Sequence, residues 1–413
     1  MQRRVVVTGL GAVTPVGNDV ATTWRALLAG TSGAGPITKF DPERFRVRFA
    51  CEVKGFDALS YMDRKEAKRA DVYTQYALAA SVQAMRDAGL SEGGFVPEET
   101  GVIIGSGIGG IQSFEEQHHV YVERGPSKIS PFFIPMFIGD MAAGIVSMRF
   151  GAKGPNYATV SACASSAHAI GDAYRAIQYG DADVMITGGS EAAVTPMSIG
   201  GFGNMTALSE RNDDPATASR PFDKGRDGFV MGEGAGVVIL EELEHARRRG
   251  ARIYGEIVGY GSTGDAYHIT GQPEDHEGLQ RAMRRALRDA GLGPGDVQYV
   301  NAHGTSTPLN DPNEIRGIRK VFGEFADQLN VSSTKSMTGH MLGAAGGVEF
   351  IASTLAIVHG IVPPTINQIE ADPECDLNVT PNTPVERRID VAISNSSGFG
   401  GHNVTLAVRR FEE

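Results

Sequence analysis

Short apolar segments that end in glycine alternate along this chain with longer segments in which small apolar residues recur every three or four positions. Residues 5–8 and 102–104 are expected to form buried strands, and each runs into a glycine turn. The segment 72–90 between them has the spacing of a helix that buries one face. Strands that alternate with helices predict an α/β protein built from layers.

The order of predicted elements occurs twice. The pattern Arg-Asp-Ala-Gly-Leu ends a predicted helix at residues 86–90 and again at 288–292. Each copy precedes a strand, a glycine turn, a helix start rich in small residues, and further strands around a second glycine turn. This predicts a duplicated unit with halves 1–254 and 255–413. The first half is expected to be longer because of insertions at about 111–150 and 196–230.

Cys163 lies where a predicted short strand at residues 157–160 meets a predicted helix. Ser161 is a suitable N-cap, and the pattern continues without a break to Tyr179, after which Gly180 is typical of a helix end. These signals place Cys163 in the first helical turn, where unpaired amides and the helix dipole favour a thiolate. They therefore predict a pKa below that of a free thiol. A buried structural cysteine is the alternative interpretation.

The formal net charge of −11 makes nucleic acid an unexpected partner. Against this acidic background, Arg64, Lys65, Lys68 and Arg69 would form one basic face on a helix, although a solvated face without a partner is the simpler interpretation. The three cysteines lie far apart in the sequence, which indicates a reducing compartment. No leader sequence is expected before the first strand, and no apolar run reaches membrane-spanning length, so a cytoplasmic protein is expected.

The glycine turn after the second predicted strand, at residues 105–110, fits the G-x-G-x-x-G pattern of dinucleotide-binding folds. That pattern also requires a second strand that ends in an acidic residue about 20 positions later. An irregular apolar stretch follows instead, at residues 131–135. We therefore do not expect a nucleotide at this turn.

Two histidines lie in glycine-flanked turns of the second half, His303 within 301–307 and His340 within 335–340, and a glycine loop follows at 395–401. Ligands of α/β sheets bind beyond the carboxyl ends of strands, so a two-fold duplication would bring these turns and Cys163 together. A thiol nucleophile with two imidazoles and backbone oxyanion donors is suited to acyl transfer. Core histidines and a Cys-His-His zinc site are the alternatives, but no C-x-x-C or H-x-x-H spacing supports zinc.

These stretches resemble the β-ketoacyl-acyl-carrier-protein synthases, and most closely the synthase II type of dissociated fatty-acid synthesis. The likeness covers residues 4 to about 408, and its motifs are Ser-Ala-Cys-Ala-Ser-Ser-Ala-His from 161, Asn-Ala-His-Gly-Thr-Ser-Thr from 301, Lys-Ser-Met-Thr-Gly-His from 335 and Gly-Phe-Gly-Gly from 398. The resemblance implies a thiolase fold, whose duplicated βαβαβαββ halves form a five-layered αβαβα core. It also implies the decarboxylative Claisen condensation of malonyl-carrier protein with an acyl chain, without a cofactor.

The resemblance implies a role for each motif. The implied catalytic residues are Cys163 as the acyl-carrying nucleophile, His303 and His340 for decarboxylation, Lys335 and Glu349 as an ordering pair, and Phe399 as a gate and oxyanion donor. The implied lining of the acyl and pantetheine sites is Ile108, Phe202, Phe229, Thr305, Thr307, Gly398 and Gly400. A structural monovalent cation is implied at Asn301, Ala302, Glu349, Ser394 and Asn395. Ser397 and His402 stand where Phe and Thr are expected, which leaves gate movement and substrate range open.

The implied partner is acyl carrier protein in its acyl and malonyl forms, and the implied assembly is a homodimer. The implied docking residues are Arg64, Lys65, Lys68, Arg69 and Lys128. A coenzyme A thiolase shares the fold, but it would carry a second catalytic cysteine where this chain has Ser396 and Ser397. A ketosynthase of a type II polyketide pathway uses the same triad. A non-catalytic chain-length partner subunit lacks the nucleophilic cysteine, which this chain has.

Overall fold

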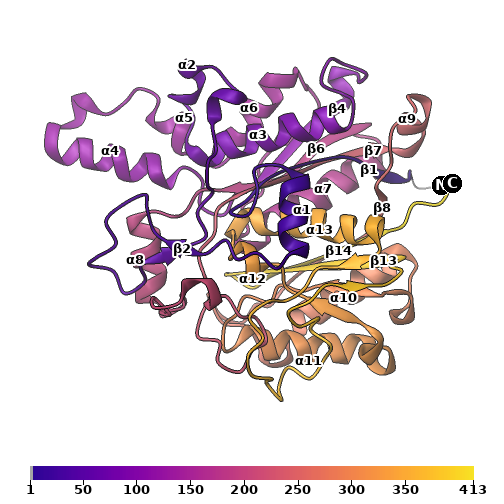
Figure 1. Ribbon diagram of the computed structural model, residues 1–413. Coiled ribbons are helices and arrows are strands. Elements are labelled where there is room, and N and C mark those ends of the chain that lie inside the picture. The colour runs from indigo at the N-terminus through magenta and orange to yellow at the C-terminus, as the bar shows by residue number, and fades with distance from the viewer. Residues whose placement is uncertain (1–2) are drawn as a thin grey trace.

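A ten-stranded sheet runs through the computed structural model, which describes residues 3–413 (Figure 1). Its first five strands in spatial order come from the N-terminal part: β5 (Asn156–Tyr157), β4 (Thr100–Gly105), β6 (Val184–Glu191), β7 (Gly234–Glu242) and β1 (Val5–Val13). The other five come from the C-terminal part: β8 (Gly255–Gly264), β14 (His402–Arg409), β13 (Val391–Gly398), β9 (Tyr299–Asn301) and β10 (Asn330–Ser332). The two groups join only where Val5–Val7 of β1 pair with β8.

Each group of five strands has the same connectivity. Counted from its outer edge, each begins with three mutually parallel strands and continues with two antiparallel ones, β5-β4-β6-β7-β1 and β10-β9-β13-β14-β8. The strands correspond in chain order as well. The predicted duplication is therefore present in the topology of the sheet.

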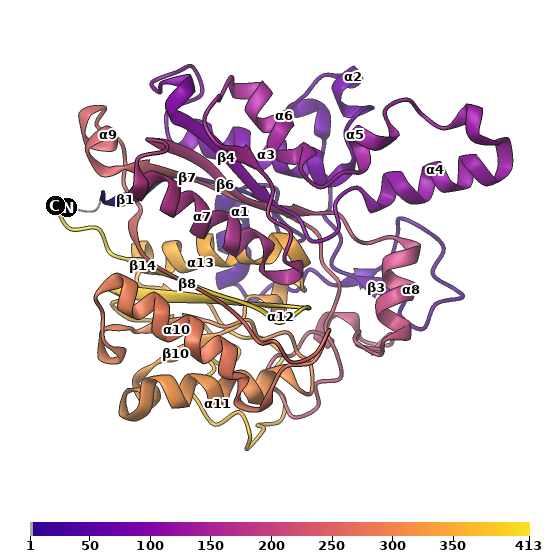
Figure 2. The same ribbon diagram turned by 180° about the vertical axis from the view of Figure 1, so that it is seen from behind.

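The helices complete five layers (Figures 1 and 2). The central layer consists of α7 (Ser165–Tyr179) and α13 (Ala345–His359), which pack on each other and on strands of both groups. The outer layers are α3 (Val72–Asp87) with α6 (Met141–Phe150) on one side and α10 (Glu277–Ala290) with α11 (Asn310–Phe322) on the other. The α/β thiolase-type architecture αβαβα is thus as expected.

One segment corrects the expectation about apolar runs. Leu342–His359, which contains α13, is long and apolar enough to cross a membrane by length and composition. It is also 89% buried inside the protein, because α13 fills the space between the two strand groups and contacts apolar side chains on every side. A helix that is hydrophobic all round is the expected choice for a central layer.

The remaining helices lie outside the layers: α1 (Val20–Leu28), α2 (Arg64–Ala67), α4 (Ile111–Arg124), α5 (Phe133–Phe137), α8 (Pro196–Asn204), α9 (Leu243–Arg248) and α12 (Lys335–Thr338). The short strands β2 (Gly35–Pro36) and β3 (Phe49–Ala50) pair with each other, as do β11 (Ile361–Val362) and β12 (Val385–Glu386). The first predicted insertion forms α4, α5 and α6, and α4 projects from the layered body (Figure 1).

The start of the Cys163 helix differs from the prediction. Residues Ala162–Ala164 form a 3₁₀ turn and α7 begins only at Ser165, so Cys163 precedes the α-helix. Ser161 does not cap the helix, because its hydroxyl lies 2.7 Å from Nδ1 of His168. The helix does end as predicted, with Gly180 in the left-handed conformation at φ 85°. The strand before the turn is also shorter than predicted, since β5 ends at Tyr157.

Candidate active site

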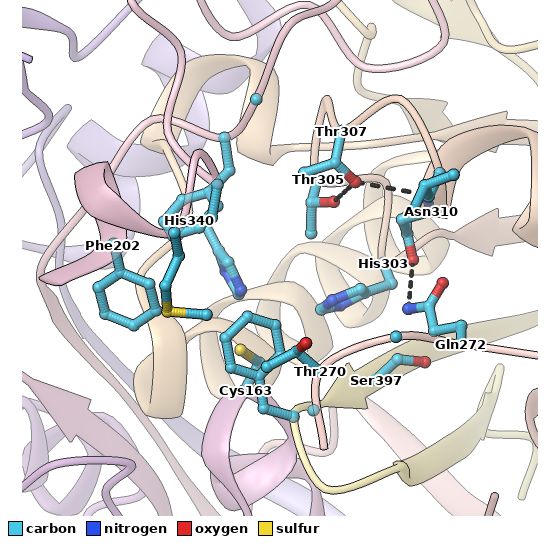
Figure 3. Close-up of a pocket in the computed structure, with 18 of the residues that line it drawn as sticks. Cys163, Phe202, Thr270, Gln272, His303, Thr305, Thr307, Asn310, His340 and Ser397 are labelled. Atoms are coloured by element: carbon cyan, nitrogen blue, oxygen red, sulfur yellow. Dashed lines mark hydrogen bonds between the residues drawn. The ribbon is translucent and has the colours of Figure 1, made fainter. Parts of the chain in front are cut away.

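Cys163, His303 and His340 line one cavity of about 350 Å³ (Figure 3). Phe399 lines the same cavity. Each comes from a turn that follows a strand or a short helix: Cys163 from the 3₁₀ turn before α7, His303 from the end of β9, His340 from the end of α12 and Phe399 from the end of β13. The duplicated fold thus brings together the cysteine and both histidines. Their sequence positions alone do not reveal this proximity.

The Cys163 thiol is buried, and the backbone N–H groups of Phe399 and of Cys163 itself favour the charged form of its sulfur. Burial raises the pKa of this thiol to about 12, and the negative charge of Glu191 acts in the same direction. The positive charge of Lys335 and the two N–H groups oppose that rise. The prediction of a lowered pKa is therefore wrong for the unliganded site, because desolvation outweighs the favourable polar groups.

The rings of His303 and His340 meet edge to face, with centroids 5.3 Å apart and an angle of 86° between their planes. Burial and the charge of Lys335 hold the pKa of both imidazoles well below the ordinary histidine value, so both are neutral near pH 7. Both Nδ1 atoms are buried without a hydrogen-bond partner. Within residues 3–413, no group of three or more His, Cys, Asp or Glu side chains is placed to hold a metal ion, which argues against a Cys-His-His zinc site.

Two buried carboxylates hold the histidine region in place. Glu314 accepts the backbone N–H groups of His303 and Gly304, each at 2.8 Å, and burial raises its pKa to about 7. Glu349 forms a buried ion pair with Lys335, as expected. Lys335 therefore brings a fixed positive charge to the site, and this charge affects the pKa of the thiol and of both imidazoles.

The apolar side of the cavity has three phenylalanines. The ring of Phe202 lies 5.5 Å from that of Phe229 and 6.2 Å from that of Phe399, measured between centroids. Both Phe202 and Phe229 line the cavity, as does Leu342, which was not among the predicted residues. Ile108 does not line this cavity, although it packs in the same apolar cluster as Cys163 and Leu342.

The polar side of the cavity has a continuous series of hydrogen bonds (Figure 3). The hydroxyls of Thr305 and Thr307 lie 3.0 Å apart, the Asn310 N–H donates to Thr307, and Gln272 donates to Asn310. Both predicted threonines therefore line the cavity, whereas no sequence signal pointed to Gln272 and Asn310. Gln272 lies in an irregular segment and Asn310 is the first residue of α11, and both are ordinary polar residues.

The glycine loop is tied to the segment after β8. Gly400, with φ 88°, donates its N–H to the carbonyl of Ile269 at 2.8 Å, and Gly401 accepts from the Asp265 N–H at 2.9 Å. Gly398 lines the cavity as predicted, but Gly400 does not. Ser397 also lines the cavity, and its hydroxyl donates to Asn403 at 2.9 Å. The ring of His402 lies 6.3 Å from that of His168, measured between centroids.

The residues of the expected cation site include neighbours in space. Asn301 and Ser394 are paired across β9 and β13, and the Asn301 amide donates to the carbonyl of Glu349 at 3.3 Å. The Asn301 Oδ1 and Glu349 Oε2 atoms are buried and have no hydrogen-bond partner. Two such oxygens fit a monovalent cation, which prefers oxygen ligands. The Asn395 side chain, in contrast, is already engaged by Thr405 and Glu314.

The basic residues expected to dock a partner are all exposed. The helix they share is shorter than predicted, because α2 ends at Ala67, with Lys68 as its C-cap and Arg69 beyond it. The guanidinium of Arg69 lies 4.1 Å above the ring of Phe132, in the segment that also contains Lys128. Among the ion pairs of residues 3–413, none involves Arg64, Lys65, Lys68, Arg69 or Lys128.

Two family models match this chain, the β-ketoacyl synthase N-terminal domain over residues 2–246 and the β-ketoacyl synthase C-terminal domain over residues 254–368. Among curated proteins, 3-oxoacyl-[acyl-carrier-protein] synthase 2 of Synechocystis sp. is 55% identical, and the match covers 100% of this chain and 99% of the relative. The protein of the same name from Staphylococcus aureus is also 55% identical, with 99% of each chain covered.

Solved structures agree over the whole length. The ishigamide ketosynthase/chain length factor is similar with a TM-score of 0.94 at 35% identity, and both chains are covered completely. A type II polyketide-synthase ketosynthase, solved in complex with its acyl-carrier protein and bound to the hexaketide, has a TM-score of 0.93 at 38% identity, again with complete coverage.

Proposed function

This chain belongs to the β-ketoacyl synthase family, and on that premise we propose that Cys163 carries the acyl chain as a thioester while His303 and His340 act on malonyl-carrier protein. The chain is a condensing acyltransferase of the 3-oxoacyl-[acyl-carrier-protein] synthase type in fatty-acid biosynthesis. The observation that carries the residue roles is the shared cavity, which the Cys163 thiol and two neutral imidazoles line together.

In the loading step, the Cys163 sulfur attacks the carbonyl carbon of the acyl-carrier thioester. The carbonyl oxygen becomes an oxyanion, and the N–H groups of Cys163 and Phe399 are placed to stabilise it. When the intermediate collapses, the bond to the carrier sulfur breaks. The thiol proton leaves Cys163 and ends on the departing carrier thiol. Because burial raises the pKa of Cys163, a base must assist this transfer, and the neutral imidazoles can serve.

In the condensing step, malonyl-carrier protein replaces the free carrier. Loss of carbon dioxide leaves the electron pair on the α-carbon, as an enolate whose oxygen needs hydrogen-bond donors. His303 and His340 are neutral and can each donate one N–H to that oxygen. The α-carbon then attacks the Cys163 thioester, a carbon–carbon bond forms, and the cysteine sulfur leaves and regains a proton. The product is 3-oxoacyl-carrier protein.

We infer a positioning role for Lys335 and Glu349. Their ion pair is buried, and the charge of Lys335 disfavours protonation of both histidines. Keeping the imidazoles neutral keeps them available as hydrogen-bond donors and as proton acceptors. A monovalent cation between Asn301 and Glu349 would fix Glu349 further, and the two unpaired buried oxygens support it. Ala302, directly after β9, and Ser394 and Asn395 in β13 would contribute to the same site, Asn395 through its backbone because its side chain is already engaged.

We further propose acyl carrier protein as the docking partner of the exposed basic residues Arg64, Lys65, Lys68, Arg69 and Lys128. Within residues 3–413 these cations have no carboxylate partner, which leaves them available to an acidic partner protein. The adjoining threonine-lined side of the cavity, with Thr305 and Thr307, suits a pantetheine arm, since hydroxyls can both donate to and accept from its amides.

We propose a homodimer that forms along β5. This strand is at the edge of the sheet, so one row of its backbone groups is unpaired. Large apolar side chains near it are exposed, with Val160, which follows it in the chain, at 68% and Met148 of the contacting helix α6 at 71%. Exposed apolar side chains beside an open strand edge favour pairing with a second copy. Sedimentation equilibrium of Val160→Glu against wild type tests this, and a monomeric wild type would exclude it.

Fatty-acid synthesis is the favoured pathway, because the relatives at 55% identity carry that name whereas the polyketide ketosynthases match at 35–38%. We also propose that the protein is located in the cytoplasm. A non-catalytic chain-length role is disfavoured by the placement of Cys163 beside both histidines.

A condensation assay with malonyl-carrier protein and acyl-carrier proteins of graded length tests the proposed function. Wild type should release carbon dioxide and form 3-oxoacyl-carrier protein, with the acyl intermediate found on Cys163 by intact mass. Cys163→Ala should form no condensation product. Normal condensation by Cys163→Ala would overturn the nucleophile assignment.

A further inference from the structure

The glycine turn at residues 105–110 binds a carboxylate of the protein itself. Glu191, the last residue of β6, is completely buried, and its carboxylate contacts the turn. Its Oε1 accepts from the Ser106 hydroxyl at 3.1 Å and from the Ile108 N–H at 3.2 Å. Its Oε2 accepts from the Gly107 N–H at 2.8 Å. In nucleotide-binding folds, the backbone N–H groups of such a turn bind a phosphate. Here the N–H groups of Gly107 and Ile108 donate to Glu191 instead.

The same carboxylate also binds a second turn, from the other half of the chain. The N–H of Gly343 donates to Glu191 Oε2 at 2.9 Å. Gly343 belongs to the 3₁₀ turn Leu342–Ala344, which follows His340 and leads into α13. The N-terminus of that helix adds a favourable dipole for a negative charge. Glu191 thus joins the turn with Ile108 to the turn with Leu342 by hydrogen bonds to both.

The two turns approach each other too closely for side chains. A Cβ atom on Gly343 would lie 2.2 Å from the Gly107 nitrogen and 2.7 Å from Glu191 Oε2. A Cβ atom on Gly107 would lie 2.8 Å from the same oxygen. These glycines are required so that both backbones can reach one carboxylate, which explains the glycine pattern that resembled a nucleotide motif.

Both turns reach the apolar surroundings of Cys163. Leu342 lines the cavity, and Ile108 packs with Leu342 and Cys163 in one apolar cluster. We propose that Glu191 is a positioning residue that sets the acyl-chain range of the enzyme by holding Ile108 and Leu342 at a fixed separation beside the nucleophile. This inference rests on the proposed role of Cys163 as the acyl carrier.

Substitution by glutamine should act selectively. Glutamine has one acceptor oxygen, and the N–H groups of Gly107 and Gly343 can only donate, so that oxygen should stay at the Oε2 position. The new NH₂ group then faces the Ser106 hydroxyl, which can turn and accept, and the Ile108 N–H, which cannot. Glu191→Gln should therefore release mainly Ile108 and leave the turn after His340 in place.

The test compares acyl loading with decarboxylation in Glu191→Gln. Loading rates on Cys163 are measured by intact mass with acyl-carrier proteins of increasing chain length, and malonyl decarboxylation is measured without primer. The ratio of loading rates for the longest and shortest accepted chains should change by about tenfold, as pocket shape changes of this size do. Decarboxylation should change by less than about twofold, since the Gly343 contact remains.

A matched control is Glu241→Gln. Glu241 is also a buried carboxylate, but it lies in β7 at the other end of the β6–β7 pair. In the strand register it is opposite Val184, the first residue of β6, whereas Glu191 is the last residue of β6. The Glu241→Gln variant should have a lower thermal stability, but its ratio of loading rates for the longest and shortest chains should not change. Ser106→Ala, which removes one contact to Glu191, should shift the ratio in the same direction as Glu191→Gln but less.

The other possible results of these measurements decide against either the role of Glu191 or the proposed function. An unchanged ratio in a folded Glu191→Gln variant would overturn the inference, as would equal losses of loading and decarboxylation. If Glu191→Gln does not fold, Ser106→Ala alone decides by whether the ratio moves. Failure of the wild type to load acyl chains on Cys163 would instead overturn the proposed function.

Discussion

The imidazoles of His303 and His340 contact each other edge to face, with ring centroids 5.3 Å apart, inside a cavity that removes both from water. In the part of the chain that the structure describes, neither ring has a carboxylate partner that would favour the charged form, and the nearby Lys335 disfavours it. The pair is therefore held neutral by burial and by one fixed charge. This property distinguishes the two histidines from exposed ones and leads to the first prediction.

Neither imidazole should titrate near the ordinary histidine pKa of about 6.5. Because their pKa values are lowered, both stay neutral as the pH falls through that range and bind a proton only at more acidic pH. Histidine-selective NMR of Cys163→Ala should show constant ring signals for both between about pH 8 and 6. An acid limb of activity near pH 7 would then belong to a carboxyl such as Glu314, whose pKa burial raises to about 7. Titration of either ring near 6.5 would contradict the prediction.

Removal of one histidine should separate the two half-reactions. His303→Ala should lower malonyl decarboxylation by roughly 10²- to 10⁴-fold, because the enolate loses a donor. Acyl loading should fall by less than about tenfold, because the two N–H groups at the sulfur and the His340 ring remain. Intact mass measures loading, and release of carbon dioxide measures decarboxylation. Complete loss of loading with the fold intact would show that His303 is needed for the first step as well.

The reactivity of Cys163 should depend steeply on pH. Since burial raises its pKa, the thiolate fraction in the unliganded enzyme is small near pH 7 and rises about tenfold per pH unit. Alkylation by iodoacetamide should therefore speed up continuously to about pH 9 and should abolish condensation. The matched control is Cys163→Ala, which reports on Cys51 and Cys375, both buried with raised pKa values. A plateau at neutral pH would mean that the sulfur is already a thiolate.

The exposed basic residues Arg64, Lys65, Lys68, Arg69 and Lys128 form a basic patch. Reversal of charge on this patch should weaken the binding of acyl carrier protein but not the chemical steps. Lys65→Glu with Lys68→Glu should raise the apparent KM for acyl carrier protein by about tenfold at low salt, and the effect should shrink as salt increases. Reaction with small acyl-pantetheine thioesters should stay nearly unchanged. Arg247→Glu with Arg248→Glu on α9 makes the same change of charge away from α2 (Figure 1) and should have little effect. Equal losses with both kinds of substrate would mean that the patch supports the fold.

Much of the site could be predicted because its motifs are local in the sequence. Both histidines lie in glycine-flanked turns and Cys163 lies among small residues at a predicted helix start, so Cys163, His303 and His340 are recognisable without a structure. The duplication was also visible, because two copies of one pattern must build two copies of one unit. The strand order and the five layers agree with that prediction.

The residues that the prediction missed act through long-range contacts. Gln272 comes from an irregular segment and Asn310 is the first residue of α11, and their mutual hydrogen bond depends on how these two distant segments meet. Ile108 was expected to line the cavity, but it packs beside it, because the backbone of its turn is held by Glu191. A buried carboxylate at the end of a strand has no periodic pattern that would reveal its partners.

The sequence by itself determined the layered α/β architecture, the duplication and the reaction class, because these depend on periodicity and on residue type within short motifs. Only the tertiary structure decided the electrostatics of the site. The pKa of Cys163 is raised rather than lowered because segments far apart in the chain exclude water from its sulfur. The turn at residues 105–110 holds Glu191 because β6 ends beside it in space. Desolvation and hydrogen bonding are set by neighbours in three dimensions, which one-dimensional patterns do not specify.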